Sequence, residues 1–507
     1  MLLNHQVRYS RAEMWTIRIS SALLYLAFFA SVLAAQAPTV ILSTYLGVAD
    51  CDGVALGPNG DLYLACHSHT SYLPIEAKPP KQPATKCDSD PEPCFDAYVL
   101  RLDPKKGKLI YATRIGGSEY DGAFRIKVDR SGFAYAVGLT RSRDFPTTAN
   151  ALQKQYGGGD SDAFLVKVAP DGQVVYATFL GGSGTDENDA LELDNQGGAF
   201  VGGTTESNDF PGQSRPRTTS KEDAFVAYIK PEDPKTFHSV VFGGQEEEML
   251  TGLALDGRGG LFAVGYTKSK DFPTVEPIQG ELRGVSDLFL TRLAIPSLTS
   301  TFSTFFGGSG EDQGWGVTVD RRGDPVVAGV ADSKDLPTSA GAHQRVNKEG
   351  QDAFVAEFQG RGYRQVRSTY FGGTKGDSSG GDGDDVKLDA EGNIWFVGWT
   401  KSSDLPTRNA LQPEYGGGDE DGFIAAFSPD LGKLCYGTYR GGTNQEGLEG
   451  LAVSSTGLVY VTGETMSPDL KMFSKSIQDR LSPVSLDGKV VNATVLGLHV
   501  VGPCRGK

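Results

Sequence analysis

Short apolar runs follow one another along most of this chain, and clusters of Gly, Asp, Ser and Pro separate them. The segment Gly314–Asp320 (GWGVTVD) alternates apolar and polar positions, and the run VVAGV follows it after a turn. Alternating positions and short apolar runs bounded by turn residues are typical of β-strands. Since no helical period recurs with them, the pattern predicts an all-β chain.

The strands belong to a repeat of about 65 residues, which a phrase ending in Gly-Gly marks. The phrase begins with an aromatic, aliphatic or arginine residue, and its first copy reads YLG. Its seven occurrences are Tyr45–Gly47, Ile115–Gly117, Leu180–Gly182, Phe242–Gly244, Phe306–Gly308, Phe371–Gly373 and Arg440–Gly442. Seven occurrences predict seven copies of one structural unit.

Each unit carries the turn chemistry of four strands. A D-x-x-G turn such as Asp320–Gly323 joins the first two strands, with Gly at the position of positive φ. The loop phrase T-x-S-x-D-[FL]-P-T, as at Thr140–Thr147, follows the second strand, because Pro does not continue a ladder. The fourth strand ends in Gly-Gly. An aspartate opens the third strand in six units: Asp96, Asp162, Asp223, Asp287, Asp352 and Asp421.

Seven units of four short antiparallel strands predict a seven-bladed β-propeller. The Ser and Asp of the loop phrase are interpreted as scaffold, since a ligand site would not recur in six copies. For the last blade, we expect Asp487–Leu496 as the third strand and Val40–Gly47, from the N-terminal end, as the fourth. The alternative register makes Asp487–Gly497 a fourth strand, because it matches Asp171–Gly181, and would displace the N-terminal strand or add it outside.

The first 35 residues predict a signal peptide. Three arginines precede the apolar run Ala22–Ala35, and small residues at Ala34, Ala35 and Ala37 suit a cleavage site. An uncleaved anchor is the alternative, but the run is shorter than the ~20 residues that span a bilayer. The predicted layout is a signal peptide at 1–35, a propeller at 38–503 and a tail at 504–507. The units lie near 48–117, 118–182, 183–244, 245–308, 309–373, 374–442 and 443–497, the last completed by 40–47.

The charge and hydropathy of the chain limit its partners and its location. The formal charge of −15 at pH 7 becomes −17 without residues 1–35, which carry three Arg and one Glu. Such an acidic chain disfavours nucleic acid, and no later stretch is apolar enough to span a membrane. We expect an exported monomer in the periplasm, at the cell surface or outside the cell.

All six cysteines follow the signal segment, and an even number suits disulfides. Cys51 and Cys66 are equidistant from the turn Gly57–Gly60 and would face each other on one hairpin. Cys87 and Cys94 bracket a short loop, which leaves Cys435 and Cys504 for a third pair. Free thiols remain the alternative, and a zinc site is disfavoured because no paired C-x-x-C occurs.

The repeat phrases resemble those of the bacterial SBBP family, whose name denotes a seven-bladed β-propeller repeat. The resemblance covers about Val40–Gly497 and depends on STYLG, Gly392–Thr400 (GNIWFVGWT), DFPT and Gly157–Phe164 (GGGDSDAF). It implies an exported bacterial protein with no general catalytic assignment. The first unit departs from the pattern, because Ser71–Cys87, rich in Pro and Lys, replaces its DFPT phrase.

Two catalytic motifs are absent: the sequence has no H-E-x-x-H pair and no Walker loop. His67 and His69 could face one way toward a metal, but no third ligand is near in sequence. We therefore expect no cofactor, although acidic loops could supply oxygen ligands to calcium. Solvated acidic turns are the alternative. The candidate binding residues are Glu187, Asp189, Glu246, Glu247, Trp315, Asp382 and Asp384.

The chain is thus predicted to be a binding or scaffold module for a protein or a polysaccharide. The alternative is an extracytoplasmic hydrolase or lyase with a carboxylate site at one propeller face. Two carboxylates that converge within about 5–10 Å in a funnel would favour that alternative. A purely structural spacer is the third hypothesis.

Overall fold

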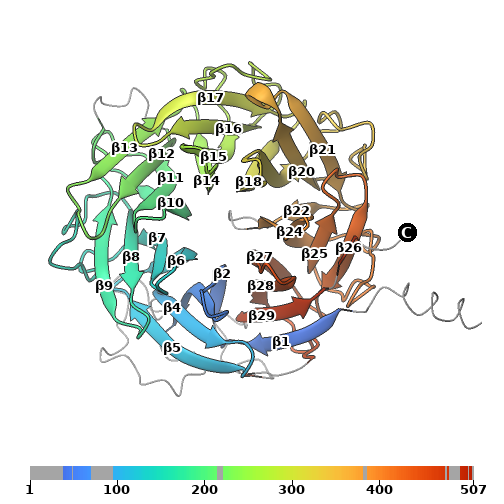
Figure 1. Ribbon diagram of the computed structural model, residues 1–507, viewed down its shortest axis with the longest axis horizontal. Coiled ribbons are helices and arrows are strands. Elements are labelled where there is room, and N and C mark those ends of the chain that lie inside the picture. Colours follow the sequence, from blue (N-terminus) through green and yellow to red (C-terminus); the bar gives the residue numbers. More distant parts are fainter. Residues whose placement is uncertain are drawn as a thin grey trace, which may run out of the picture. The chain divides into compact units, whose positions relative to one another are not determined.

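Seven antiparallel sheets stand side by side around a ring in the computed structural model (Figure 1). The structure describes residues 38–47, 49–69, 95–213, 221–380, 385–473, 477–478, 491–500 and 502–504. The ring belongs to one unit, Pro38–Cys504. The predicted signal peptide, the Ser71–Cys87 insertion, Cys87 and Cys94 therefore lie outside the described residues, as do Asp382 and Asp384.

The blades follow the repeat. Blade 1 consists of β2 (Ala49–Leu56), β3 (Leu62–His69), β4 (Phe95–Asp103) and β5 (Lys108–Ile115). Blade 2 consists of β6 (Asp121–Val128), β7 (Ala134–Thr140), β8 (Asp162–Val168) and β9 (Val174–Leu180). Blade 3 consists of β10 (Asp186–Leu193), β11 (Ala199–Thr205), β12 (Asp223–Ile229) and β13 (Phe237–Phe242). Blades 4 and 5 consist of β14 (Glu248–Leu255), β15 (Gly260–Thr267), β16 (Asp287–Ala294) and β17 (Thr299–Phe306); and β18 (Asp312–Val319), β19 (Pro325–Ala331), β20 (Asp352–Gln359) and β21 (Gln365–Phe371), with a 3-10 turn at Arg361–Tyr363.

Blades 6 and 7 complete the ring. Blade 6 has a split first strand, β22 (Asp377–Ser379) and β23 (Val386–Leu388), followed by β24 (Ile394–Thr400), β25 (Asp421–Phe427) and β26 (Leu434–Arg440). Blade 7 has the order β27 (Glu446–Val453), β28 (Leu458–Thr465), β29 (Asn492–His499) and β1 (Thr39–Tyr45). The prediction of seven four-stranded blades is therefore confirmed.

In blade 7 the N-terminal strand is the outermost one. β1 pairs with β29 from Thr39 opposite His499 to Tyr45 opposite Thr494 (Figure 1). The third strand begins at Asn492, five residues after the predicted start, because Asn492 opposite Thr465 takes the register that an aspartate has in the other blades. The alternative register is wrong, since β29 lies between β28 and β1.

The D-x-x-G turns form as predicted. Gly323 has φ 70°, and its N–H donates to the Asp320 carbonyl at 2.8 Å. The Asp320 carboxylate accepts the N–H groups of Arg322 (2.7 Å) and Asp324 (2.9 Å), which holds the hairpin closed. Because Gly adopts this φ without a steric cost, the turn keeps its glycine even where the aspartate is lost, as at Gly457.

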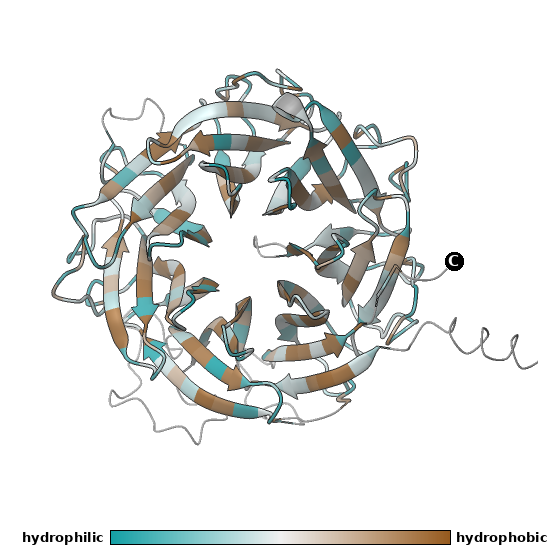
Figure 2. Cartoon of the chain, in the orientation of Figure 1, coloured by the Kyte–Doolittle hydropathy of each residue, from teal (hydrophilic) through white to brown (hydrophobic). Residues whose placement is uncertain are grey.

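The core lies between neighbouring blades. Every residue of β8 is buried, and Phe164 and Val166 pack in one cluster with Tyr63 and Ala65 of the preceding blade. Figure 2 shows the apolar residues along the strands and the polar residues along the loops. Burial of each large apolar side chain stabilises the fold by about 1.5–3 kcal/mol. Each blade thus depends on its neighbours for a dry face.

The Gly-Gly phrase lies where two acids from consecutive blades meet. A Cβ on Gly181 would be 2.7 Å from Asp162 Oδ1 and 2.7 Å from Asp186 Oδ2. The second glycine, Gly182, donates its N–H to Asp186 Oδ2 at 2.7 Å. Acids of consecutive blades flank the equivalent glycines Gly116, Gly243, Gly307 and Gly372. The phrase therefore requires glycine because side-chain oxygens fill the space of a Cβ.

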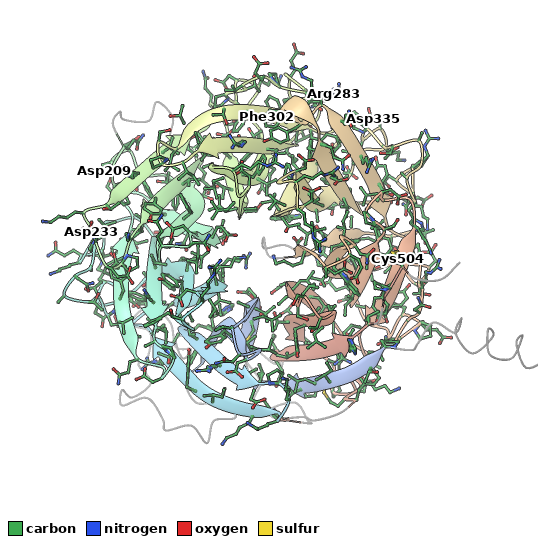
Figure 3. The ribbon with its side chains drawn as sticks, viewed as in Figure 1. Asp209, Asp233, Arg283, Phe302, Asp335 and Cys504 are labelled. Atoms are coloured by element: carbon green, nitrogen blue, oxygen red, sulfur yellow. A yellow bond between two sulfur atoms is a disulfide. The ribbon has the colours of Figure 1, made fainter. Side chains whose placement is uncertain are left out.

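The loop phrase completes this network, as the scaffold interpretation predicted. Ser207 Oγ donates to Asp186 Oδ2 at 2.7 Å and accepts the Gly184 N–H at 2.8 Å. Asp209, at the outside of the ring in Figure 3, accepts the N–H of Ser183 at 2.7 Å. A structural role thus accounts for the repeated Ser and Asp.

A repeated glutamine, which the sequence analysis missed, joins the same network. Gln153 Nε2 donates to Asp162 Oδ2 at 3.3 Å, and Gln153 Oε1 accepts the Gly181 N–H at 3.0 Å. Gln279, Gln344 and Gln412 make the same two bonds in blades 4, 5 and 6. The signal was present, because each glutamine precedes the third-strand aspartate by eight or nine residues.

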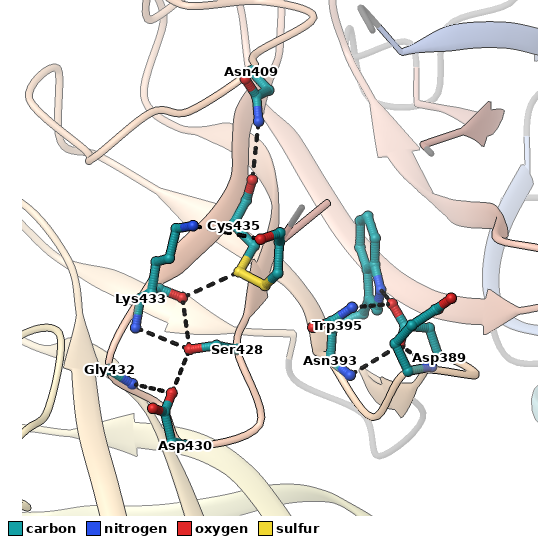
Figure 4. Close-up of a disulfide and its surroundings, with 11 residues drawn as sticks. Asp389, Asn393, Trp395, Asn409, Ser428, Asp430, Gly432, Lys433 and Cys435 are labelled. Carbon is teal, nitrogen blue, oxygen red and sulfur yellow. Dashed lines mark hydrogen bonds between the residues drawn. A yellow bond between two sulfur atoms is a disulfide. The ribbon is translucent and has the colours of Figure 1, made fainter. Parts of the chain in front are cut away.

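Two of the predicted disulfides lie within the described residues. Cys51–Cys66 joins β2 to β3, and both residues are fully buried. Cys435–Cys504 attaches the C-terminal segment to β26, where Asn409 donates to the Cys435 carbonyl at 3.1 Å (Figure 4). Such bonds are typical of proteins outside the cytoplasm.

Alanine at the first glycine of a pair should destabilise the ring. In Gly181→Ala the new Cβ meets two acid oxygens that backbone and hydroxyl donors hold, so we expect a loss of about 1–3 kcal/mol in the free energy of unfolding. Gly341→Ala is the control, because no atom lies within 4 Å of that Cβ position. Denaturant unfolding measures both; equal stabilities would contradict the steric explanation.

The two disulfides should differ in reactivity. Cys504 is half-buried whereas Cys51 and Cys66 are not exposed, so a mild reductant should open Cys435–Cys504 first. Alkylation followed by mass spectrometry measures the order. Loss of the Cys435–Cys504 bond removes a cross-link over 69 residues and should lower the free energy of unfolding by about 2–4 kcal/mol. Simultaneous opening of both bonds in the folded protein would contradict this expectation.

Candidate functional site

The first strand of each blade lies nearest the ring axis and carries an irregularity at the same place (Figure 1). In six blades a β-bulge interrupts its pairing with the second strand. In blade 6 residues 380–385 separate β22 from β23. The residues added at the bulges are chemically different: Asp52 with Cys51, Phe124, Asp189, Thr251, Trp315 and Glu449. A bulge re-aims a side chain and is common beside binding sites.

These bulges lie toward the face on which the first strands begin, here called the rim face. Acidic residues gather there, and we call this set the acidic rim: Asp50, Asp52, Glu187, Glu206, Glu222, Glu247, Glu449 and Glu464. Partial desolvation and the like charges of Glu206, Glu247 and Glu187 raise the pKa of Glu222. The acids of blades 3 and 4 therefore share one electrostatic environment.

The predicted residues of blades 3 and 4 lie on this face. Glu187 is half-buried and accepts a hydrogen bond from Ser161 Oγ at 3.1 Å. Asp189 is the bulge residue of β10. Glu246 is exposed, whereas Glu247 forms ion pairs with Lys268 (2.5 Å) and Lys221 (3.5 Å). Glu187 and Glu247 both lie close enough to Glu222 to raise its pKa, but they do not form a close pair with each other.

Aromatic side chains stand beside the acids. Trp315 is half-buried and contacts Tyr266 edge to face, with ring centroids 5.9 Å apart. Its indole N–H is buried and has no acceptor within the described residues. Lys401 lies over the Trp399 ring at 5.3 Å. The rim face thus offers flat apolar surfaces next to carboxylates.

A closer acidic cluster lies between blades 7 and 1. One carboxylate oxygen from each of Asp50, Asp52 and Glu449 lies within 4.8 Å of the others. Asp52 is almost fully buried, and the other two are half-buried. These three residues could hold a divalent cation, which prefers several oxygen ligands. The sequence did not indicate this cluster, because ring closure joins residues that are far apart in the chain.

His67 borders the cluster and is the neutralising group for Asp52. Its Nδ1 is 3.7 Å from Asp52 Oδ2, and its ring contacts Phe95, Tyr120 and Phe124. Burial lowers the pKa of His67, but Asp52, with Asp50 and Glu464, more than compensates and raises it. His67 and Arg125 outweigh the effect of burial on Asp52, so its pKa is lowered.

The opposite end of the ring axis has charges of both signs. A cavity of about 940 Å³ lies there, lined by the ends of the first strands of blades 1, 2, 3, 6 and 7. Its lining includes the basic residues Lys127, Arg130, Lys167 and Lys387 and the acidic residues Asp129, Glu192, Asp194 and Glu232. Basic and acidic side chains thus balance at this end.

Comparison with known proteins shows distant likenesses. No family model matches the chain. The regulatory protein FlaEY of Caulobacter vibrioides is 25% identical over 361 residues, which are 67% of this chain and 35% of that protein. The chain thus spans about a third of that relative's length.

Two solved structures resemble the ring. A protein of unknown function from Dyadobacter fermentans aligns over 92% of this chain and 98% of its own, with a TM-score of 0.39 and 11% identity. A putative gluconolactonase aligns over 66% and 84%, with a TM-score of 0.29 and 12% identity. The seven-bladed ring is consistent with a propeller repeat family. Within the described residues no helix is long and apolar enough to cross a membrane.

The His67–Asp52 pair should be visible by titration. We expect His67 to titrate above the ordinary value of about 6.5 and Asp52→Asn to lower its pKa. His343 is the internal control, because burial, Lys348 and Arg408 lower its pKa far from this pair. The raised pKa makes the pair stabilising below about pH 6.5, and this stability is lost as pH rises through the folded pKa. NMR of the histidine side chains measures both; an unchanged His67 in Asp52→Asn would contradict the pairing.

Proposed function

We propose that this chain is an exported binding module that takes up a neutral or amine-bearing glycan at the acidic rim. The observation that carries the proposal is the bulge in the first strand of six blades, which places a different residue beside the ring axis in each copy. The repeated Ser, Asp and Gly residues, in contrast, are bonded to one another as scaffold. Recognition therefore falls to the residues that vary.

The chemistry of the rim favours sugars. Carboxylates such as Glu187 accept hydrogen bonds from hydroxyl groups, and flat rings such as Trp315 and Tyr266 can stack on the apolar face of a pyranose. The clustered negative charge around Glu222 would repel uronates and sulfated chains. A neutral or amine-bearing chain is thus the ligand class that the rim fits best.

A second candidate is a hydrolase or lyase acting at the junction of blades 7 and 1. One oxygen from each of Asp50, Asp52 and Glu449 lies within 4.8 Å of the others, slightly closer than the ~5–5.5 Å between the carboxyl groups of retaining glycosidases. His67, whose pKa Asp52 raises, could supply or accept a proton beside them. This candidate uses different residues from the candidate binding residues that the sequence analysis named.

A polysaccharide panel tests the proposal. Neutral glucans, chitosan oligomers and polyuronates are offered to the mature protein, and binding is measured by calorimetry. We expect binding of a neutral or amine-bearing chain, a weakening of about tenfold in Trp315→Ala and in Glu187→Gln, and no change in Lys106→Ala on the opposite face. Preferential binding of polyuronate, or equal affinity in all variants, would contradict the proposal.

Product analysis on the same panel separates the two candidates. Turnover that is lost in Asp52→Asn would favour the enzyme at the junction of blades 7 and 1. Binding without new reducing ends would favour the binding module.

A further inference from the structure

At two blade junctions, two acids are buried beside one glycine, and within the described residues no cation is directed at them. At the first, Asp162 and Asp186 flank Gly181; at the second, Asp287 and Asp312 flank Gly307. All four carboxylates are fully buried. Two buried carboxylates whose oxygens lie within 2.9 Å of the same Cβ position do not both ionise without a large electrostatic cost. Each junction therefore needs a means of neutralisation.

The groups that face these acids are dipoles and further acids. The first pair is faced by Gly157, Gln153, Tyr156, Gly182, Thr205, Ser207 and Asp209. The second pair is faced by Gln279, the Arg283 and Gly284 N–H groups, Gly308, Ser333, Tyr370 and Asp335. The Arg283 side chain faces Asp335, at the outside of the ring (Figure 3). No cation within the described residues is directed at either pair.

Three other junctions have a cation near their acids, although burial still raises the pKa of Asp352 to about 7. Arg114 forms an ion pair with Asp96 at 2.6 Å in blade 1. Lys348 faces Asp352 in blade 5, and Arg440 faces Glu446 where blade 6 meets blade 7. Since the acid pairs at Gly181 and Gly307 have no such side chain in the described part of the chain, they must be neutralised in a different way.

The closing junction shows what a neutral group looks like at this position. Asn492 has the register of Asp162 and is fully buried, and Ala49 has the register of Asp186. An amide has the shape of a protonated carboxyl group and, like it, can donate a hydrogen bond. The chain thus already places a neutral donor where six blades carry an aspartate.

One oxygen of Asp162 and one of Asp287 have no hydrogen-bond partner within the described residues. These Oδ1 atoms are buried, whereas the Oδ2 atoms accept bonds from Gln153 and Gln279. We propose that Asp162 and Asp287 each carry a proton on Oδ1 in the folded ring and donate it toward Asp186 and Asp312. Folding then takes up one proton at each junction, and the ring is a proton-linked structure.

The direction of the pH effect follows. Burial, and then the neighbouring acid, raise the pKa of Asp162 to about 7 and that of Asp287 to about 6, from an ordinary value near 3.9. A raised folded pKa contributes stability that is complete below about pH 4 and is lost as pH rises to between 6 and 7. The propeller should therefore gain stability on mild acidification.

Denaturant unfolding between pH 4.5 and 8 tests the proposal on the whole protein. In the wild type each site should lower the folding constant by up to about tenfold per pH unit within its window. The double variant Asp162→Asn/Asp287→Asn should lose both contributions to this slope and be at least as stable as the wild type at pH 8. A slope equal to that of the wild type would overturn the proposal.

Surface aspartates provide the matched control. Asp103→Asn/Asp430→Asn removes two acids that do not face either pair and whose pKa is lowered by bonds from Lys106 and Ser428, so the slope above pH 5 should stay that of the wild type. Infrared spectroscopy provides a readout that needs no stable variant. At about pH 5 the folded wild type should show a protonated carboxyl band that ordinary aspartates lack at this pH. Its absence would overturn the proposal.

Discussion

The ring depends on the approach of two carboxylates to the first glycine of the Gly-Gly phrase, which is seen at five blade junctions. One acid opens the third strand of a blade, and the other opens the first strand of the next blade, as Asp162 and Asp186 do around Gly181. The second glycine and the loop phrase donate hydrogen bonds to the first-strand acid. Because the bond from the second glycine joins the end of one blade to the first strand of the next, as Gly182 does with Asp186, it fixes where the next blade begins. Apolar packing between blades then stabilises that placement.

The parts of the fold that follow from local chemistry were predictable from the sequence. A D-x-x-G turn needs only its own four residues, so the hairpins and the number of blades could be counted directly. The Ser and Asp of the loop phrase could be assigned to scaffold because they recur. The glutamine that bonds to the third-strand aspartate, such as Gln153, recurs as well, but its spacing from that aspartate varies by one residue. That small variation hides it from a search for fixed phrases.

The candidate site was less predictable, for a physical reason. Asp50, Asp52 and Glu449 meet only because β1 completes the blade that begins with β27. Their proximity depends on closure of the whole ring, and no local pattern encodes it. The bulges are similar: one added residue in a first strand leaves the apolar pattern almost unchanged, although it re-aims a side chain. The start of the last third strand was misplaced because Asn492 replaces the aspartate that marks it elsewhere.

The same substitution explains why the closing junction differs from the other six. Asn492 and Ala49 occupy the two positions that carry acids at other junctions. The closing junction therefore needs neither a proton nor a cation to neutralise charge at these two positions. The acids of the junction appear instead one and three residues further along β2, at Asp50 and Asp52, beside the bulge that the Cys51–Cys66 disulfide holds. The Gly-Gly network does not include them; they contact Glu449 and His67. Among the described residues, a ring of similar blades thus carries an asymmetric acidic cluster where its two ends meet, and that asymmetry follows from ring closure and not from the repeat.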